Sequence, residues 1–483
     1  VYTHGYGLCM TPVNKITEDG LPFFYVKDLP PSSSIDLKIN RPEIYFGEKT
    51  SEFIVVNTDQ KEFDYPKGDS NEYTKYAGTG GIKVGSLLNK LIFSFKFNDL
   101  AFLTSSYIKN DSKLLFDHNI KKIVSKLTDF IVYDSDPYLV VTEEGRLIWM
   151  LDGYTISSHF PYSEKIQGRV NYIRNSVKVT IDAYDGTTTF YIADDSDPII
   201  KTLANIYPNL FVSLNEMPED EKSHIRYPKD LFRVQAMKYA TYHMTDPQVF
   251  YNREDLWQIP NETYDTETQE MNPYYLVTKL PGDDKESFVL MLPFSPTNKD
   301  NMIGWMAVKC NPDEYGEFVV YKLPKDRTVY GPMQIESRID QDTEISKDLT
   351  LWGQIGSRVI RGNLMIIPIE DSLLYVEPIY LQAEQSELPE LKRVIMSYGD
   401  EVVMDKNLNT VIDTVFGDKK VTYVTEIKDE AEPKNVDLMQ YLFETYDKLK
   451  KNAQSLEWED FGIQLDKIDS ILDKLKNQAV IVD

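Results

Sequence analysis

Two histidines and two neighbouring carboxylates in the middle of the chain have the side chains best suited to metal or proton chemistry. His224 and His243 stand 19 positions apart, and Glu254 and Asp255 follow them. Imidazole and carboxylate groups can together bind a metal ion or transfer protons near neutral pH. The spacing matches no metalloenzyme signature such as HExxH. These residues are therefore catalytic candidates, with Asp255 as an orienting group, and a structural, hydrogen-bonded role is the alternative that the spacing favours.

Two acidic phrases, Asp-Ser-Asp-Pro at 134–137 and again at 195–198, bring several carboxylates within a few residues of one another. Hard carboxylate oxygens are the ligands that Ca²⁺ prefers, although neither phrase has the glycine and the terminal glutamate of an EF-hand loop. Aspartate before proline also starts turns, and a turn is the favoured alternative. The candidate Ca²⁺ ligands are Asp134, Asp136, Asp194, Asp195 and Asp197.

The segment 331–383 crowds amides, arginines and aromatic side chains between short runs that are typical of strands. Its polar residues alternate with apolar ones, as if one face of a sheet were polar. Such a face could hold a sugar or a peptide. The favoured alternative is a buried polar network that joins two domains. The candidate ligand-binding residues are Arg338, Gln341, Gln354, Arg361 and Asn363.

Several common site motifs are missing from the sequence. The glycine-rich segments 3–7 and 78–81 do not form a phosphate-binding GxxxxGK[ST] loop, and no GxSxG motif is present. Cys9 and Cys310 are the two cysteines, without a CxxC pair, so no disulfide framework is implied. Nucleotide binding and serine hydrolysis therefore have no motif in their favour.

The charge balance restricts the partners. The chain of 483 residues has 52 Lys and Arg against 77 Asp and Glu, a net charge of −25. A negative field repels nucleic acid and anionic lipid head groups, and it attracts Ca²⁺ or cationic polymers. An acidic surface without any partner is the alternative. No apolar run approaches the roughly 18 residues that a membrane helix needs.

The apolar pattern predicts the elements that would position these residues. Helical spacing marks 84–95, 120–130 and 199–206, and near-heptad spacing marks 436–446 and 458–475. Two hairpins are predicted. The first pairs strands at 138–141 and 147–151, and the second pairs strands at 177–183 and 188–192. Further short strands are expected at 23–26 and 53–57. From 272 to about 425 the pattern is almost wholly that of strands. Within it, the segment 388–398 fits either a helix or a strand.

We therefore expect a multidomain α+β protein. Extended chain at 1–79 lies on the core, an α+β domain spans 80–265, a β-rich domain spans 266–425, and amphipathic helices at 426–483 form a helical hairpin. The chain begins at Val1 without an initiator methionine or a signal-peptide pattern, so we expect it to be a piece of a longer protein.

Long ordered motifs along nearly the whole chain resemble those of Uncharacterised Protein Family 0182, large multi-pass bacterial membrane proteins. They include THGYG at 3–7, RPEIYFGE at 41–48, DPYLVV at 136–141, DPQVFYNREDLW at 246–257 and the block 331–383. The resemblance implies about seven hydrophobic helices ahead of such a region, membrane attachment only through those helices, and a place outside the cytoplasm. It implies no activity, cofactor or catalytic residue.

Two hypotheses follow from the sequence. The first is a non-enzymatic extracytoplasmic domain that binds or scaffolds a component of the cell envelope. The second is a metal-assisted hydrolase acting on envelope material.

Overall fold

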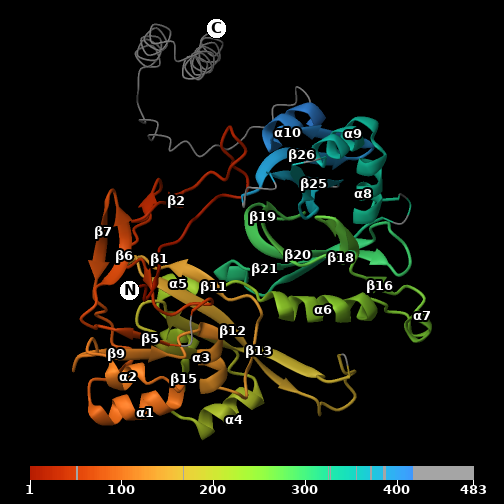
Figure 1. The fold of residues 1–483 in the computed structure, drawn as a ribbon. Coiled ribbons are helices and arrows are strands. Elements are labelled where there is room, and N and C mark those ends of the chain that lie inside the picture. The colour runs from red at the N-terminus through yellow and green to blue at the C-terminus, as the bar shows by residue number, and fades with distance from the viewer. Residues whose placement is uncertain are drawn as a thin grey trace, which may run out of the picture. The chain divides into compact units, whose positions relative to one another are not determined.

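The computed structural model of this chain has a mixed α+β architecture, which confirms the predicted fold class (Figure 1). It describes residues 1–50, 53–166, 168–324, 326, 328–354, 356–369, 372–383 and 388–416. These residues lie in one compact unit, Val1–Gly417. The amphipathic helices expected at 426–483 lie outside the described residues. Within the part described, no helix is long and apolar enough to cross a membrane.

The first 79 residues are largely extended and supply a few large side chains to a core built by later elements. Tyr45 and Phe46 are buried against Val177 and Ile181 of the central sheet. Of the strand predicted at 23–26, only Val26 lies in a strand. The short strands here are β1 (Gly5–Tyr6), β2 (Val26–Lys27), β3 (Ser32–Ser33), β4 (Glu43–Ile44), β5 (Phe53–Val56), β6 (Glu62–Lys67), β7 (Ser70–Thr74) and β8 (Ile82–Lys83).

A small lobe follows, made of two helices against a three-stranded sheet with the order β5-β9-β8. Its elements are α1 (Leu87–Phe97), α2 (Ala101–Thr104) and β9 (Lys113–Phe116). Ser86 caps the start of α1 by accepting from the Asn89 amide, and Asn98 ends it in the left-handed conformation. The predicted helix is confirmed. Its apolar stripe nevertheless faces outward, and the residues that α1 buries are Phe93 and Ser94.

The central sheet has the order β10-β12-β13-β14-β15, with β11 paired to β12. Both predicted hairpins are confirmed, since Val141 pairs with Leu147 and Ile181 pairs with Thr188. Helices α3 and α4 cover one face with Ile120, Val124 and Ile200. The elements are α3 (Ile120–Leu127), β10 (Val132–Tyr133), β11 (Tyr138–Val141), β12 (Leu147–Ser157), β13 (Tyr172–Asp182), β14 (Thr188–Ile192), α4 (Pro198–Ile206) and β15 (Phe211–Ser213).

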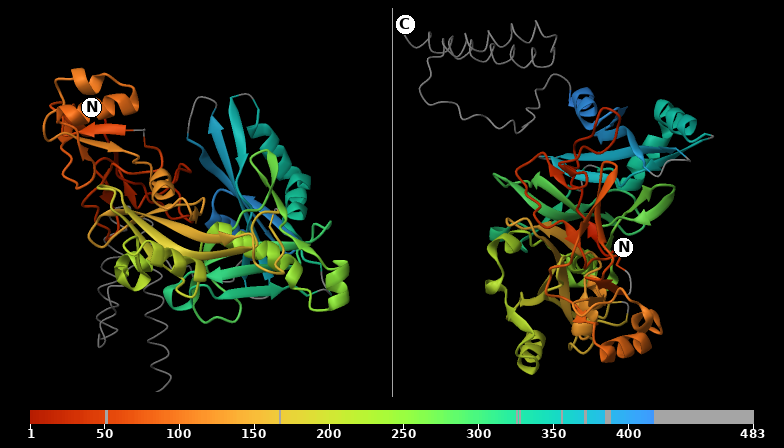
Figure 2. Two further views of the ribbon diagram at one scale, coloured as in Figure 1. Left: turned by 90° about the horizontal axis from the view of Figure 1, so that it is seen from below. Right: turned by 60° about the vertical axis from the view of Figure 1, so that its left-hand side comes forward.

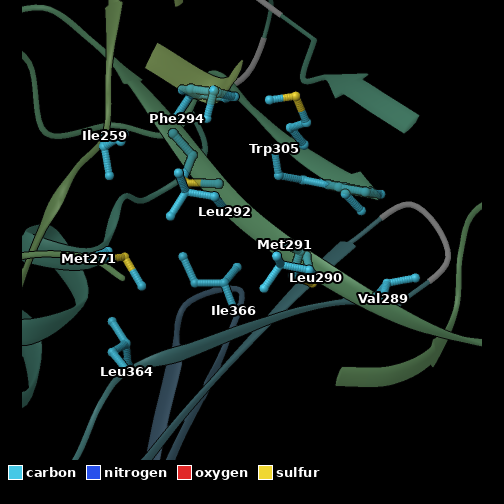
Figure 3. Close-up of a cluster of buried hydrophobic side chains, with 14 of the residues drawn as sticks. Ile259, Met271, Val289, Leu290, Met291, Leu292, Phe294, Trp305, Leu364 and Ile366 are labelled. Carbon is cyan, nitrogen blue, oxygen red and sulfur yellow. The ribbon is translucent and has the colours of Figure 1, made fainter. Parts of the chain in front are cut away.

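Three helices lead into a second sheet with the order β16-β20-β21-β22, in which β19 pairs with β20. Phe232 and Ala236 of α6 join the side chains of β20 and β21 in the largest apolar cluster, which includes the buried Trp305 (Figure 3). The elements are η1 (Leu214–Glu216), α5 (Glu219–Ser223), α6 (Lys229–Tyr242), α7 (Pro247–Asn252), β16 (Trp257–Gln258), β17 (Asn261–Tyr264), β18 (Glu267–Glu270), β19 (Tyr274–Lys279), β20 (Glu286–Pro296), β21 (Gly304–Lys309), η2 (Pro312–Glu314) and β22 (Phe318–Lys322).

A third sheet has the order β23-β25-β26-β27, with β24 paired to β25. Successive side chains of β25 alternate between two cores, because Tyr375 faces the large cluster while Leu374 and Val376 pack with Val411 of α10. The undecided segment 388–398 forms a strand. The elements are β23 (Ser357–Arg361), β24 (Met365–Ile369), β25 (Ser372–Ala383), β26 (Glu390–Tyr398), β27 (Glu401–Asp405) and α10 (Leu408–Phe416).

The expectation that 272–425 consists almost wholly of strands was wrong at Leu408–Phe416, which forms α10. It was also wrong between 332 and 352. This segment forms α8 (Pro332–Gln341) and α9 (Thr343–Trp352). Proline at the first position of α8 favours its start, and Asp342 caps α9 by accepting from two amides. The buried Ile335 and Ile339 are four residues apart, a helical spacing that the interspersed polar residues obscured.

A polar centre lies on the face of the central sheet that α3 and α4 leave uncovered. Lys178 and Asp152, 3% and 4% exposed, form an ion pair between β13 and β12. Lys178 also donates to the Tyr315 hydroxyl at 2.8 Å, and this hydroxyl lies 3.5 Å from the Arg226 carbonyl oxygen. The Arg226 guanidinium lies over the Tyr138 ring, with its carbon 4.0 Å from the ring centroid. The centre thus joins the central sheet to Arg226, which precedes α6, and to Tyr315, which precedes β22.

Replacing Lys178 with methionine should destabilise the protein by about 3–5 kcal/mol, because it leaves the Asp152 carboxylate buried without its cation. The double variant Lys178→Met/Asp152→Leu should recover most of this loss, since an apolar pair of similar volume can replace a buried ion pair. Urea unfolding of the three proteins measures both effects. A single variant within about 1 kcal/mol of the parent would contradict the assignment.

Candidate ligand-binding pocket

The structure does not gather the predicted histidine cluster into one site. His224 ends α5 and is exposed, whereas His243 ends α6, a helix of 14 residues and so about 21 Å long. His243 is buried and stacks on Trp257 with ring centroids 3.8 Å apart. Burial lowers the pKa of His243 and so favours the neutral ring. Its Nε2 lies 3.8 Å from Asp255, and Glu254 is exposed and accepts from Asn252.

In the described residues, no group of three or more His, Cys, Asp or Glu side chains is placed to hold a metal ion. This holds for the histidine cluster and for both acidic phrases. The catalytic and Ca²⁺-binding roles considered for them gain no support from their arrangement.

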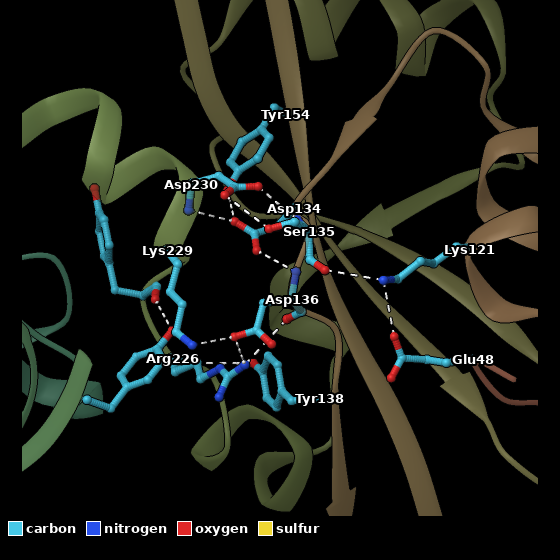
Figure 4. Close-up of polar contacts among 12 residues, drawn as sticks. Glu48, Lys121, Asp134, Ser135, Asp136, Tyr138, Tyr154, Arg226, Lys229 and Asp230 are labelled. Atoms are coloured by element: carbon cyan, nitrogen blue, oxygen red, sulfur yellow. Dashed lines mark hydrogen bonds and ion pairs between the residues drawn. The ribbon is translucent and has the colours of Figure 1, made fainter. Parts of the chain in front are cut away.

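The first acidic phrase is bound to the start of α6 (Figure 4). Asp134 is buried, accepts from the Tyr154 hydroxyl, and also accepts from the Asp230 amide at 3.0 Å. Asp136 pairs with Arg226 at 2.9 Å and with Lys229 at 3.0 Å. Both carboxylates therefore hold the loop before β11 against the first turn of α6.

The second acidic phrase starts α4. Asp197 is fully buried and caps this helix through the amides of Ile199 and Ile200, and it also accepts hydroxyl bonds of 2.6–2.7 Å from three side chains. The three donors are Thr155, Tyr172 and Ser176. Asp194 pairs with Arg174 at 2.9 Å, and Asp195 is exposed on the turn. The arrangement is that of a turn followed by a capped helix.

The polar residues of 331–383 do not form one row. Arg361 lies in a buried network, in which it donates to both oxygens of Glu377 and to Glu336 and Asp340. Burial raises the pKa of Glu336, and the neighbouring Glu377 raises it further. Arg338 on α8 donates to the Gly399 carbonyl at 3.2 Å, while the other three candidates are exposed at separate places. Those three are Gln341, Gln354 and Asn363.

A pocket with a volume of about 480 Å³ opens at one end of the central sheet. Its floor is the sheet face opposite α3 and α4, and its rim comes from the two hairpin turns and from α5. The lining residues are Thr142, Glu143, Glu144, Arg146, Ile148, Thr180, Asp182, Asp185, Thr187, Thr189, Tyr191, Pro218, Asp220 and Glu221.

The pocket carries a surplus of negative charge, with six carboxylates against one guanidinium. Arg146 donates from Nε to Asp182 at 2.8 Å and lies 3.6 Å from Asp185. On the opposite rim, Asp220 and Glu221 belong to α5, and one oxygen of Glu221 is buried without a hydrogen-bond partner in the part of the chain that is described. Burial raises the pKa of Glu221, and Asp220 and Asp182 raise it further. An incoming cation would relieve this repulsion.

Sequence reasoning did not find this pocket, although it predicted both hairpins that build it. The turn residues 143–146 and 184–186 are predicted from the sequence only as connections between strands. Their meeting depends on the register of β12 and β13, in which Ile148 pairs with Asp182, 34 positions later in the chain. The third wall, at 218–221, comes from a helix that the sequence did not predict.

The family profile described as Uncharacterised protein family (UPF0182) matches residues 1–352, which contain every residue of the pocket. The chain belongs to this family. The earlier resemblance is thereby confirmed. No solved structure matches the chain.

Curated UPF0182 proteins align with nearly the whole chain. That of Desulforamulus reducens is 50% identical over 99% of this chain and 53% of its own length. That of Pelotomaculum thermopropionicum is 48% identical over 99% of this chain and 53% of its own length. That of Methanospirillum hungatei is 51% identical over 87% of this chain and 47% of its own length. This chain thus spans about half the length of the curated relatives it matches.

Asp197→Asn should lower the free energy of unfolding by about 1.5–3 kcal/mol at pH 7, because it removes charge from a carboxylate that accepts several hydrogen bonds. These bonds outweigh desolvation and depress the pKa of Asp197 below its ordinary value of 3.8. The stabilisation is therefore present above that value and is lost as the pH falls through the folded-state pKa. The deficit should shrink in urea unfolding at about pH 3.

The exposed neighbour Asp195 supplies the control. Asp195→Asn should change the stability by less than about 0.5 kcal/mol at either pH. Equal deficits for Asp197→Asn at the two pH values would show that the bonds do not depend on the carboxylate charge.

Proposed function

We propose that this part of the UPF0182 protein is an extracytoplasmic, non-enzymatic domain that binds or scaffolds a component of the cell envelope. We further propose that its acid-lined pocket takes an organic polycation, such as a polyamine or an oligosaccharide of amino sugars. The observation that carries the proposal is the surplus of carboxylates around one concave site.

The size and chemistry of the pocket suit such a ligand. Its volume of about 480 Å³ falls within the range of roughly 300–1,000 Å³ that small-molecule sites occupy. The carboxylates stand on three separate walls, which suits several ammonium groups held apart by an organic chain. A single Ca²⁺ ion would instead need its oxygens at roughly 2.3–2.6 Å from one point. The threonines of β13 and β14 add hydroxyls that can accept from ammonium groups or bind sugar hydroxyls.

The proposed location rests on the resemblance described above, which implies about seven hydrophobic helices ahead of this region. An odd number of membrane spans, with the amino terminus inside the cell, would place this region outside the cytoplasm. The acidic character of the domain fits a partner of opposite charge, and the net charge of −25 would draw cations toward it at low ionic strength. A metal-assisted hydrolase is not proposed, because no observation in the described residues favours it.

Spermine binding tests the pocket. We expect the 483-residue protein to bind spermine in isothermal titration calorimetry at low ionic strength, and Asp220→Asn/Glu221→Gln to weaken this binding at least about tenfold, or about 1.4 kcal/mol. Binding should also weaken as the pH is lowered through the raised pKa of Glu221, because protonation removes one negative charge from the pocket.

A matched variant separates the pocket from the general negative field. Asp284→Asn/Glu286→Gln removes the same two charges from exposed positions at the start of β20. It should retain the parent affinity within about twofold. Equal weakening by the two double variants would mean that spermine binds the overall charge, and the pocket assignment would then be lost.

Protease accessibility of the full-length protein tests the location. Added trypsin should cleave this domain in cells whose outer barrier has been opened, because the domain faces away from the cytoplasm. It should be protected in inside-out membrane vesicles, with a known cytoplasmic domain as the control. The reverse pattern would place the domain in the cytoplasm and would overturn this half of the proposal.

A further inference from the structure

Helix α1 presents an apolar face that nothing in the described residues covers. Its outward side chains are strongly exposed, with Leu87 at 72%, Leu91 at 50% and Phe95 at 92% of full exposure. Leu88 and Ile92 are also exposed. At about 100° per residue, these five side chains fall within an arc of roughly 140° on one side of the helix. An exposed stripe of this kind on a folded unit marks an interaction site.

The lobe has its own core on the opposite side of α1. Phe93 is buried with Phe102, and the ring centroids of Phe97 and of Phe53 on β5 lie 4.4 Å apart. Ser86 and Asn98 cap both ends of the helix. The exposed leucines, isoleucine and phenylalanine are therefore additional to the residues that hold the helix in place. Figures 1 and 2 show the orange α1 and α2 at the edge of the unit, where a large planar partner can approach.

The charge of this lobe is opposite to that of the chain as a whole. Residues 82–113 contain five lysines and two aspartates, a net charge of +3 in a chain of −25. Lys83 and Lys96 are exposed beside or on α1. The stem of Lys96 reaches back over the Phe116 ring, with Nζ 4.9 Å from the ring centroid. A helix with Leu, Ile and Phe on one face and lysines along its edge has the composition of a helix that lies in a membrane interface.

We propose that α1 docks on a lipid bilayer that contains anionic head groups. Its five apolar side chains enter the boundary between head groups and acyl chains, and the neighbouring lysines remain among the phosphates. The negative charge elsewhere on the protein does not prevent this contact, because salt screens charges beyond about 8 Å at physiological ionic strength. The inference is independent of the pocket and of its ligand.

A second copy of this chain is a less suitable occupant. Dimers most often form about a twofold axis, which brings the same patch of both protomers together. The lysines of two identical lobes would then face each other, and like charges across an interface oppose association. The same lysines are complementary to a surface of lipid phosphates.

Vesicle co-sedimentation of the 483-residue protein tests the proposal. We expect binding to vesicles of phosphatidylcholine with about 30% phosphatidylglycerol at about 0.1 M NaCl, and weaker binding to phosphatidylcholine alone or at about 0.5 M NaCl. Leu91→Ser/Phe95→Ser should lower the partition coefficient at least about tenfold. Both positions are exposed, so the thermal unfolding of the variant should match that of the parent.

The matched control is Leu351→Ser/Tyr251→Ser, which removes an exposed leucine on α9 and an exposed aromatic ring on α7. It should bind like the parent. Phe95→Trp should add a fluorescence signal that brominated lipids quench, and little extra quenching would contradict insertion of α1. Absence of vesicle binding by the parent, or equal binding by Leu91→Ser/Phe95→Ser, would overturn the proposal. The proposal would also be overturned if the parent self-associated without vesicles and Leu91→Ser/Phe95→Ser did not. A second copy of the chain would then be the occupant of this face.

Discussion

The structure depends above all on how a charged centre is neutralised between two sheets. The buried pair of Lys178 and Asp152 would be costly to desolvate if it were not held by further polar contacts. Tyr315 supplies one such contact, and Arg226 extends the chain of polar groups to Asp136. These residues come from distant parts of the sequence, so the centre brings together the central sheet, the segment at Arg226 and the segment at Tyr315.

The same sheet face that carries this centre also carries the pocket. Strand β13 turns Val177, Val179 and Ile181 toward α3 and α4, so alternation places Lys178, Thr180 and Asp182 on the other side. In the middle of the sheet this polar side is closed and its charges are paired. At the hairpin end it is open and acidic groups outnumber the single arginine. One strand pattern thus yields both a structural element and a candidate binding site.

Local patterns predicted much of the fold, and distant contacts account for most of what was missed. The hairpins joined at Val141 and at Ile181 follow from alternation over a few residues. The role of Arg361 could not be read from its neighbours, since its partners Glu336 and Glu377 lie on α8 and β25. Spacing alone gave α1 correctly, but it cannot say which face a helix buries. The pocket was missed because its three walls meet only through strand register and a short helix.

Arg146 gives the pocket a tethered competitor. Its guanidinium already pairs with Asp182 and Asp185. Because the guanidinium is attached to the protein, it competes with free ligands at an effective concentration in the millimolar range. A small monovalent cation cannot readily displace it. A molecule with several positive groups can first engage Asp220 and Glu221 on α5, which form no ion pair within the described residues, and then exchange with the arginine. The pocket would in this way discriminate among cations by the number and spacing of their positive charges.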